Sequence, residues 1–182
     1  MKNIEDITQR IKAASLPVGM SVKIVAVDGH GGSGKSTLAE RLSKELGAEV
    51  VHTDDFASWD NTLDWWPSLK DKVLEPIKNG AKTLNYNRSS WASDHHPEPV
   101  VDQPVTPIII LEGVSSARKE FRPYLSFAIW VETPVDVCME RGLARDGQPA
   151  KEQWLQWLAD EDIYIARDSP QEYANLIVKG TE

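Results

Sequence analysis

The order of apolar and polar positions divides the chain into segments of strand length and segments of helix length. Short apolar runs have the length of β-strands at 22–27, 49–52, 107–113, 127–132 and 173–178. Amphipathic segments with helical spacing alternate with these runs, at 4–16, 38–46, 63–80, 134–147 and 152–168. The run PIIILEG is apolar at successive positions, as in a strand that is buried on both faces of a parallel sheet. The pattern therefore predicts an α/β fold with a parallel sheet.

The first apolar run, 22–27, leads into the glycine-rich turn GHGGSGKST. Gly29, Gly34, Lys35 and Ser36 satisfy the pattern G-x-x-x-x-G-K-[ST] between a predicted strand and a predicted helix. Glycines permit positive φ and let backbone N–H groups approach phosphate oxygens. The turn is therefore predicted to bind a nucleotide through Gly29, His30, Gly31, Gly32, Ser33, Gly34, Lys35, Ser36 and Thr37. A Gly/Ser-rich turn that binds nothing is the alternative.

Acidic residues follow two of the predicted strands. Asp54 and Asp55 come after the run 49–52, and Glu112 lies at the end of the run 107–113. In an open parallel sheet, ligands bind outside the carboxyl ends of the strands, where these side chains would meet the phosphates. We expect Ser36 and Glu112 to hold Mg²⁺ or its water shell, and Asp54 or Asp55 to take a proton from a hydroxyl or to help hold the metal. Alternatively, one of these aspartates only caps the next segment.

Arginines and tryptophans supply further candidates for the site. Arg141 and Arg145 are four residues apart on a predicted helix, so both can clamp phosphates, or both can form solvated ion pairs with neighbouring carboxylates. Trp65 and Trp91 belong to a tryptophan-rich segment, 56–91, whose rings can line a substrate site or pack in the core. Residues 92–107 are rich in proline and polar residues, which predicts a surface loop.

Size and charge narrow the class of protein. The 182 residues fit a single domain, 1–182, and the net charge of −8 argues against a nucleic acid as the main partner. No apolar run is long enough to cross a bilayer, and the first residues lack the apolar region of a signal peptide. We therefore expect a cytoplasmic protein that does not bind membranes. The single cysteine, Cys138, is expected to be a small buried residue.

With these segments in place, the chain resembles the uridine kinase and phosphoribulokinase branch of P-loop kinases, and most of all the small bacterial uridine-kinase-like proteins. The likeness covers nearly the whole length and rests on VDGHGGSGKST, HTDDF, VLEPIKNG, LEGV, IWVETPVDVCMERGLARD and the final P-x-x-Y-A-N-L-I-V. It implies a three-layer P-loop NTPase fold with a five-stranded parallel sheet in the order 2-3-1-4-5. It also implies a short helical lid at about 141–160.

The resemblance also implies roles for individual residues. Ser36, Asp54 and Glu112 match positions that surround Mg²⁺ in such kinases, and Asp54 matches the base that acts on the acceptor hydroxyl. Lys35 matches the phosphate lysine, and Arg141 and Arg145 match arginines at the mouth of the lid. The substrate is expected to contact Asp55, Tyr86, Trp91 and Trp65.

The sequence thus predicts a kinase that depends on ATP and Mg²⁺ and phosphorylates a hydroxyl group of a small molecule, with a nucleoside such as uridine or cytidine as a candidate. The alternative from another class is a nucleotide-dependent switch. A GTPase switch would need DxxG after the third strand and an NKxD motif, whereas this chain has LEGV there and no NKxD. A P-loop protein that binds nucleotide without catalysis is a third alternative, and a homodimer is left open.

Overall fold

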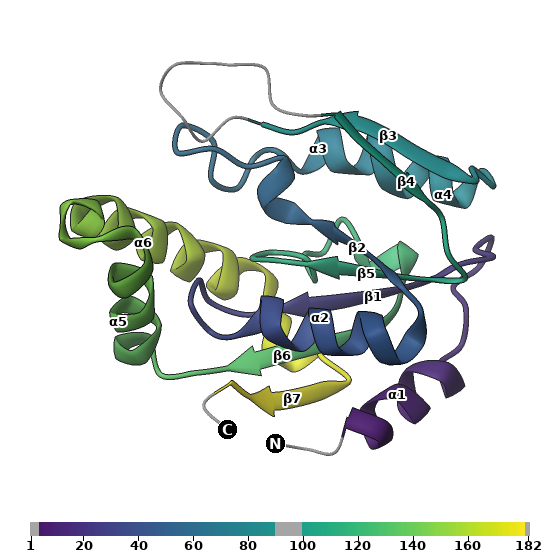
Figure 1. Ribbon diagram of the computed structural model, residues 1–182, viewed down its shortest axis with the longest axis horizontal. Coiled ribbons are helices and arrows are strands. Elements are labelled where there is room, and N and C mark those ends of the chain that lie inside the picture. Colours follow the sequence, from purple (N-terminus) through teal and green to yellow (C-terminus); the bar gives the residue numbers. More distant parts are fainter. Residues whose placement is uncertain (1–3, 90–99, 181–182) are drawn as a thin grey trace.

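The structure is a computed structural model that describes residues 4–89 and 100–180 (Figure 1). Its centre is a five-stranded sheet in the order β2-β5-β1-β6-β7, in which all neighbouring strands are parallel. The strands are β1 (Lys23–Asp28), β2 (Glu49–His52), β5 (Ile108–Glu112), β6 (Leu125–Glu132) and β7 (Leu176–Lys179). When only these strands are counted along the chain, their spatial order is 2-3-1-4-5. The predicted fold class and strand order are therefore confirmed.

Helices cover both faces of the sheet and continue beyond one end of it. The longer helices are α1 (Ile4–Ala13), α2 (Lys35–Leu46), α5 (Val135–Asp146) and α6 (Lys151–Asp168). A continuous helical run comprises α3 (Trp66–Leu69), the π-helical turn η2 (Lys70–Leu74) and α4 (Glu75–Lys78). Short helical turns complete the list: η1 (Thr53–Asp55), η3 (Arg122–Tyr124), η4 (Gln148–Ala150) and α7 (Pro170–Tyr173).

The central strand β1 shows how the core is divided. Ile24 and Ala26 belong to a cluster that includes the α3–α4 run, whereas Val25 and Val27 belong to a second cluster with α1 and α2. Successive side chains of a strand point to opposite faces of the sheet, so β1 contributes to both clusters and is buried on both sides. This explains why residues 24–27 of β1, IVAV, form an uninterrupted apolar run.

One segment differs from the prediction. A two-stranded antiparallel sheet pairs β3 (Thr83–Asn87) with β4 (Val100–Pro104), beside the α3–α4 run (Figure 1). The prediction of a surface loop over 92–107 is thus wrong at β4. The alternation is short, with Leu84 and Tyr86 buried on β3 and only Val101 buried on β4, so the sequence pattern is too weak to identify these strands.

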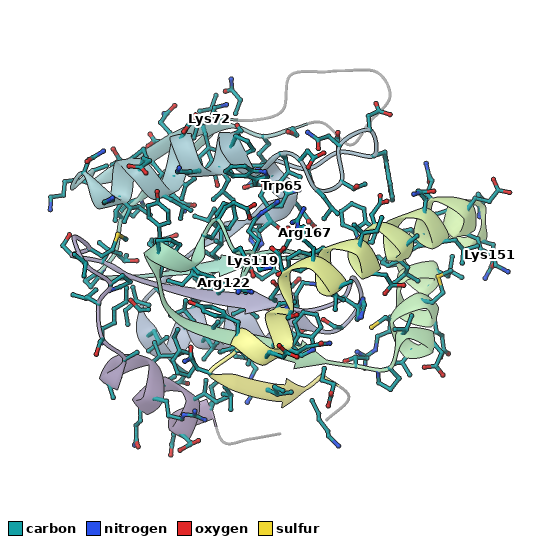
Figure 2. All side chains as sticks on the ribbon, turned by 180° about the vertical axis from the view of Figure 1, so that it is seen from behind. Trp65, Lys72, Lys119, Arg122, Lys151 and Arg167 are labelled. Atoms are coloured by element: carbon teal, nitrogen blue, oxygen red, sulfur yellow. The ribbon has the colours of Figure 1, made fainter. Side chains whose placement is uncertain are left out.

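Helices α5 and α6 lie side by side at the end toward which β6 points (Figure 1). The C-terminal end of α6 is held by cations: Lys119 donates a hydrogen bond to the carbonyl of Arg167, and Arg122 donates one to the carbonyl of Asp168 (Figure 2). Such contacts satisfy the last carbonyl groups of a helix. The segment 141–160 is helical as expected, and its movement as a lid stays a prediction. Within the part of the chain described here, no helix has the length and apolar character needed to cross a membrane.

Candidate functional site

The glycine-rich turn joins the end of β1 to the start of α2. Gly29, Gly32 and Gly34 have φ values of 149°, 76° and 99°. A Cβ at Gly32 would lie 2.4 Å from the carbonyl oxygen of Cys138, and one at Gly29 would lie 2.5 Å from the carbonyl oxygen of Val131. Only glycine fits at these two positions. The first N–H groups of α2 have no acceptor within the helix, so the turn forms an anion cradle at a helix N-terminus.

Lys35 lies across this turn. Its side chain is buried, and Nζ donates a hydrogen bond of 2.7 Å to the carbonyl oxygen of His30. An ammonium group held in this way lies next to the N–H groups at the start of α2. Both features favour the same ligand, a chain of phosphates.

Two strand tips bring carboxylates to the turn. Glu112 at the end of β5 lies beside Val27 of β1 and beside His52 of β2. Its neighbour Gly113 has φ 136°, and a Cβ there would lie 1.9 Å from Thr53 Oγ1. The missing side chain therefore lets the end of β5 approach the η1 turn, which carries Asp54.

Glu112 and Asp54 lie in different environments, which shift their pKa values in opposite directions. Burial alone would raise the pKa of Glu112, but a hydrogen bond to His52 (2.7 Å) and the charge of Lys35 outweigh it, so this pKa lies below its usual value. Ser36 Oγ donates a further hydrogen bond of 3.2 Å to Glu112. Asp54 is an exposed residue of the η1 turn, and desolvation by the surrounding protein raises its pKa, an effect that the charge of Lys35 offsets in part. Glu112 is thus the more firmly ionised group, and Asp54 accepts a proton more readily.

Two cavities meet at Lys35 and Ser36. The first, called the basic cavity here, has a volume of about 360 Å³ and is lined by five cations: Lys35, Arg41, Arg141, Arg145 and Lys179. The second, called the tryptophan cavity, has a volume of about 550 Å³. It is lined by three tryptophans, Trp59, Trp154 and Trp157. Its charged lining residues are Asp54, Asp55, Glu112, Asp146, Lys35, Arg88 and Arg145.

The structure brings most of the candidate residues together. Lys35, Ser36, Asp54 and Glu112 all line the tryptophan cavity. Asp55 lines it as well, with Oδ2 accepting a hydrogen bond of 3.0 Å from the Tyr86 hydroxyl. Four of the predicted residues, from the start of α2 and the ends of two strands, thus line one cavity together with Asp55.

The two arginines of α5 are held differently. Arg141 lines the basic cavity only, and its Nη1 donates hydrogen bonds to the carbonyl oxygens of Gly32 (3.3 Å) and Gly180 (3.2 Å). Arg145 lines both cavities and donates two hydrogen bonds to Asp146, from Nε (2.7 Å) and from Nη2 (2.9 Å). The ion pair that the sequence left open thus occurs at Arg145, whereas Arg141 contacts the carbonyl groups of Gly32 and Gly180, and clamping of phosphates by either arginine stays a prediction.

Two expected substrate residues lie away from both cavities. Trp65 and Tyr86 are buried, at 4% and 3% exposure, and line neither cavity. Trp65 packs in the core, where the guanidinium of the buried Arg118 lies 5.8 Å from its ring centroid. Trp91 falls outside the residues that the structure describes.

Helix α6 contributes residues that sequence reasoning missed. Glu161 is 1% exposed, and it accepts hydrogen bonds from the N–H of Gly31 (2.8 Å) and from Trp157 Nε1, and pairs with His30 Nδ1 (2.7 Å). The ring of Trp154 lies about 3.0 Å from where a Cβ of Gly31 would stand. The spacing offered one signal: Glu161 follows Trp154 by seven residues, which places both on one face of a helix. An acidic residue on an apolar face indicates a specific partner.

Asp28 is a second buried carboxylate at this edge. It accepts hydrogen bonds from the N–H groups of Gly29 (2.7 Å), Ser115 (3.1 Å) and Ala117 (2.8 Å), and from the hydroxyl of Tyr164 (2.6 Å). Complete burial raises its pKa despite these four bonds. Asp28 thereby joins the phosphate turn, the segment after β5 and α6 into one unit.

The parallel sheet, the glycine turn, Lys35 and the strand-tip carboxylates together define the P-loop class of nucleotide-binding folds. No family model matches the chain. Its sequence is similar to uridine kinases: it is 26% identical over 147 residues to that of Pectobacterium atrosepticum, covering 68% of each chain. It is 25% identical over 178 residues to the uridine kinase of Borrelia hermsii, covering 86% of each chain.

Solved structures show the same fold. A possible uridine kinase from Bacillus stearothermophilus has a TM-score of 0.68 at 22% identity and covers 96% of both chains. A putative fructose transport system kinase from a Silicibacter species has a TM-score of 0.59 at 21% identity, covering 98% of this chain and all of that one, 100%. The chain therefore has a P-loop kinase fold, and the resemblance to uridine kinases that its sequence shows is confirmed.

Proposed function

We propose that this chain is a kinase that depends on ATP and Mg²⁺ and transfers the γ-phosphoryl group to a hydroxyl group of a small molecule. The observation that supports this function most directly is the meeting of the two cavities at Lys35 and Ser36. A nucleotide in the basic cavity would present its last phosphate at this junction to an acceptor in the tryptophan cavity. The relatives named uridine kinase make a nucleoside such as uridine a candidate acceptor.

The side chains at the junction fit Mg²⁺. Ser36, Asp54 and Glu112 offer only oxygen atoms, and Mg²⁺ prefers oxygen ligands, often one or two carboxylates together with substrate phosphates and waters. Across residues 4–89 and 100–180 no group of three or more His, Cys, Asp or Glu side chains could hold a metal by itself. This suits an ion that arrives with a nucleotide. When bound, Mg²⁺ would neutralise negative charge on the phosphate oxygens.

The chain's own groups would do the remaining work. The N–H groups of the glycine turn and Lys35 hold the phosphates, and Arg145 offsets charge that develops during transfer. The acceptor oxygen forms a bond to the γ-phosphorus, the bond to the bridging oxygen of ADP breaks, and the hydroxyl proton goes to Asp54. We choose Asp54 as the base because it lines the tryptophan cavity close enough to Lys35 and Glu112 to interact with their charges, and because its raised pKa helps it to accept a proton.

The test is acceptor-dependent release of ADP across a panel of nucleosides, sugars and vitamin precursors, with ATP and Mg²⁺. We expect at least one acceptor to be phosphorylated, and Lys35→Ala to lower this turnover by about 10²–10³-fold. Lys44→Gln serves as the control because Lys44 is exposed on α2 and lines neither cavity. Turnover that persists in Lys35→Ala contradicts the proposal, and ADP release that needs no acceptor supports the nucleotide-switch alternative.

A further inference from the structure

Arg88 is a cation that the proposed transfer reaction does not use. It follows β3 directly and lines the tryptophan cavity but not the basic cavity. The other two cations of the tryptophan cavity are Lys35 and Arg145. Both line the basic cavity as well, so they lie at the junction where the γ-phosphoryl group would be transferred. Arg88 is thus the cation of this cavity that is placed away from the donor phosphates.

Arg88 forms an ion pair with Asp55, which positions its side chain. Its Nε lies 3.0 Å from Asp55 Oδ1, while Asp55 Oδ2 accepts the hydrogen bond from Tyr86. The next residue, Ser89, donates hydrogen bonds from its N–H to the carbonyl oxygen of Asp55 (2.6 Å) and from its hydroxyl to the carbonyl oxygen of Phe56 (3.0 Å). The end of β3 is therefore bonded directly to the turn that carries Asp54, and Arg88 faces the same cavity as that base.

The exposure of the pair shows which part of Arg88 is available. The Asp55 side chain is 12% exposed, whereas the Arg88 side chain is 45% exposed. Neither Nη group of Arg88 forms a hydrogen bond to any of the described residues, 4–89 and 100–180. A guanidinium whose Nε lies in an ion pair, and whose two Nη groups form no hydrogen bond to the described residues, can offer two parallel donors, the geometry that suits a carboxylate or a phosphate.

The rest of the cavity suits the carbon skeleton of a small molecule. Trp59 and Trp157 meet edge to face, with ring centroids 6.1 Å apart and an interplanar angle of 79°. Their rings supply apolar surface to a cavity whose other walls are charged. A compound in this cavity would meet these rings as well as Asp54 and Arg88, both of which also line it.

We propose that Arg88 binds the acceptor, and that the acceptor is a small hydroxyl compound which also carries an oxyanion, either a carboxylate or a phosphate. This inference rests on the proposed kinase function and names the chemical class of its acceptor. The hydroxyl group lies at Asp54 and receives the phosphoryl group, and the oxyanion lies at the Nη groups of Arg88 and is unchanged by the reaction. Binding of the oxyanion fixes which hydroxyl group of the acceptor reaches the phosphate.

The test measures binding and not turnover. The full chain is first saturated with Mg²⁺ and a non-hydrolysable ATP analogue, so that the phosphate positions are filled. Paired compounds are then titrated by calorimetry: glycerate with glycerol, pantothenate with pantothenol, and ribose 5-phosphate with ribose. The first two pairs test a carboxylate and the third tests a phosphate. Uridine is included as a neutral nucleoside.

We expect the anionic member of at least one pair to bind about tenfold or more tightly than its neutral partner, since a charge-assisted bidentate contact is worth at least that much. Arg88→Gln should reduce this preference to about twofold or less without changing the affinity for the ATP analogue. Arg88→Lys keeps the charge but loses the fork, so its preference should be intermediate. Lys82→Gln, at the other end of β3, is the matched control because Lys82 lines neither cavity.

Asp55→Asn distinguishes recognition from a structural role. If Arg88 recognises an anion, removal of the neighbouring carboxylate charge should leave the preference intact or increase it. If the pair only supports the turn, Asp55→Asn and Arg88→Gln should lose affinity to the same extent. The inference is overturned by that second result, by a preference that survives in Arg88→Gln, or by the absence of any anion preference in the wild-type chain. Failure of the ATP analogue to bind the wild-type chain would instead refute the proposed function.

Discussion

The basic cavity and the tryptophan cavity share four lining residues, Gly32, Lys35, Ser36 and Arg145, but differ in charge. The described lining of the basic cavity contains five cations and no carboxylate, although the chain as a whole carries a net charge of −8. The tryptophan cavity contains four carboxylates and three cations. A site for a polyphosphate needs concentrated positive charge, whereas a site where a hydroxyl loses its proton needs a base and metal ligands. This difference in charge supports the proposal that the nucleotide binds in the first cavity and the acceptor in the second.

The comparison also separates fixed parts from adaptable parts. The shared part includes Gly32, where a side chain would collide with the carbonyl of Cys138, and Lys35, which donates a hydrogen bond to the carbonyl oxygen of His30. The outer wall of the tryptophan cavity comes from more exposed residues such as Trp59 and Arg88. Acceptor specificity can therefore change through the outer wall while the phosphate site keeps its geometry.

The largest expected effect comes from the base. Asp54→Asn should lower acceptor-dependent turnover by about 10²–10⁴-fold, because an amide cannot take the hydroxyl proton. Affinity for an ATP analogue should stay within about threefold, since Asp54 does not line the basic cavity. Single-turnover kinetics and calorimetry measure the two quantities. Asp60→Asn, an exposed carboxylate of the same segment, is the control. An equal loss of turnover and of affinity for the ATP analogue would contradict the proposal that the two cavities bind different substrates.

Binding of Mg²⁺ should depend on Glu112, which lines the tryptophan cavity. Glu112→Gln should raise the Mg²⁺ concentration for half-maximal turnover by about 10–100-fold, because it weakens an oxygen ligand or the group that orients one. Chelation of Mg²⁺ should abolish turnover in the wild-type chain. Glu40→Gln on the exposed face of α2 should leave the Mg²⁺ dependence unchanged. The assignment of Glu112 to the metal fails if its variant shows the wild-type dependence.

Arg141 tests the basic cavity alone. Arg141→Gln should weaken binding of the ATP analogue by about tenfold through the loss of one charge-assisted contact, with little effect on the KM for the acceptor. Lys72→Gln, an exposed cation of the α3–α4 run, should change neither value (Figure 2). A larger effect on the acceptor than on the nucleotide would reverse the assignment of the two cavities.

The smallest effect on ligand affinity is expected for Glu161, which supports the glycine turn. Glu161→Gln should reduce the free energy of unfolding by about 1–3 kcal/mol, because the buried carboxylate holds the N–H of Gly31 and the ring of His30. Since Gly31 lines the tryptophan cavity and Gly32 lines both, affinity for nucleotide and acceptor should fall together and only modestly. Thermal denaturation measures the first effect, with Glu152→Gln, exposed on α6, as the control. An unchanged melting temperature would show that Glu161 does not hold the turn.

Much of the fold was predictable from short stretches of sequence. The strand Glu49–His52 was located to the residue, and the other sheet strands and longer helices were located to within a few residues. Apolar runs and helical spacing are local properties, so the sequence shows them directly. The hairpin of β3 and β4 was not found, because its alternation is short and half exposed.

The residues of the proposed phosphate site could also be identified from the sequence, since Gly29 to Thr37 are consecutive residues and the acids at the strand ends follow apolar runs. The tertiary structure decided the rest. It placed Trp59, Trp154 and Trp157 in a cavity wall and buried Trp65 beside Arg118. It also brought Glu161 to a turn that lies 130 residues earlier in the chain. Periodicity identifies which side of a helix is covered, but the partner depends on how distant segments pack, and that packing is a property of the whole fold.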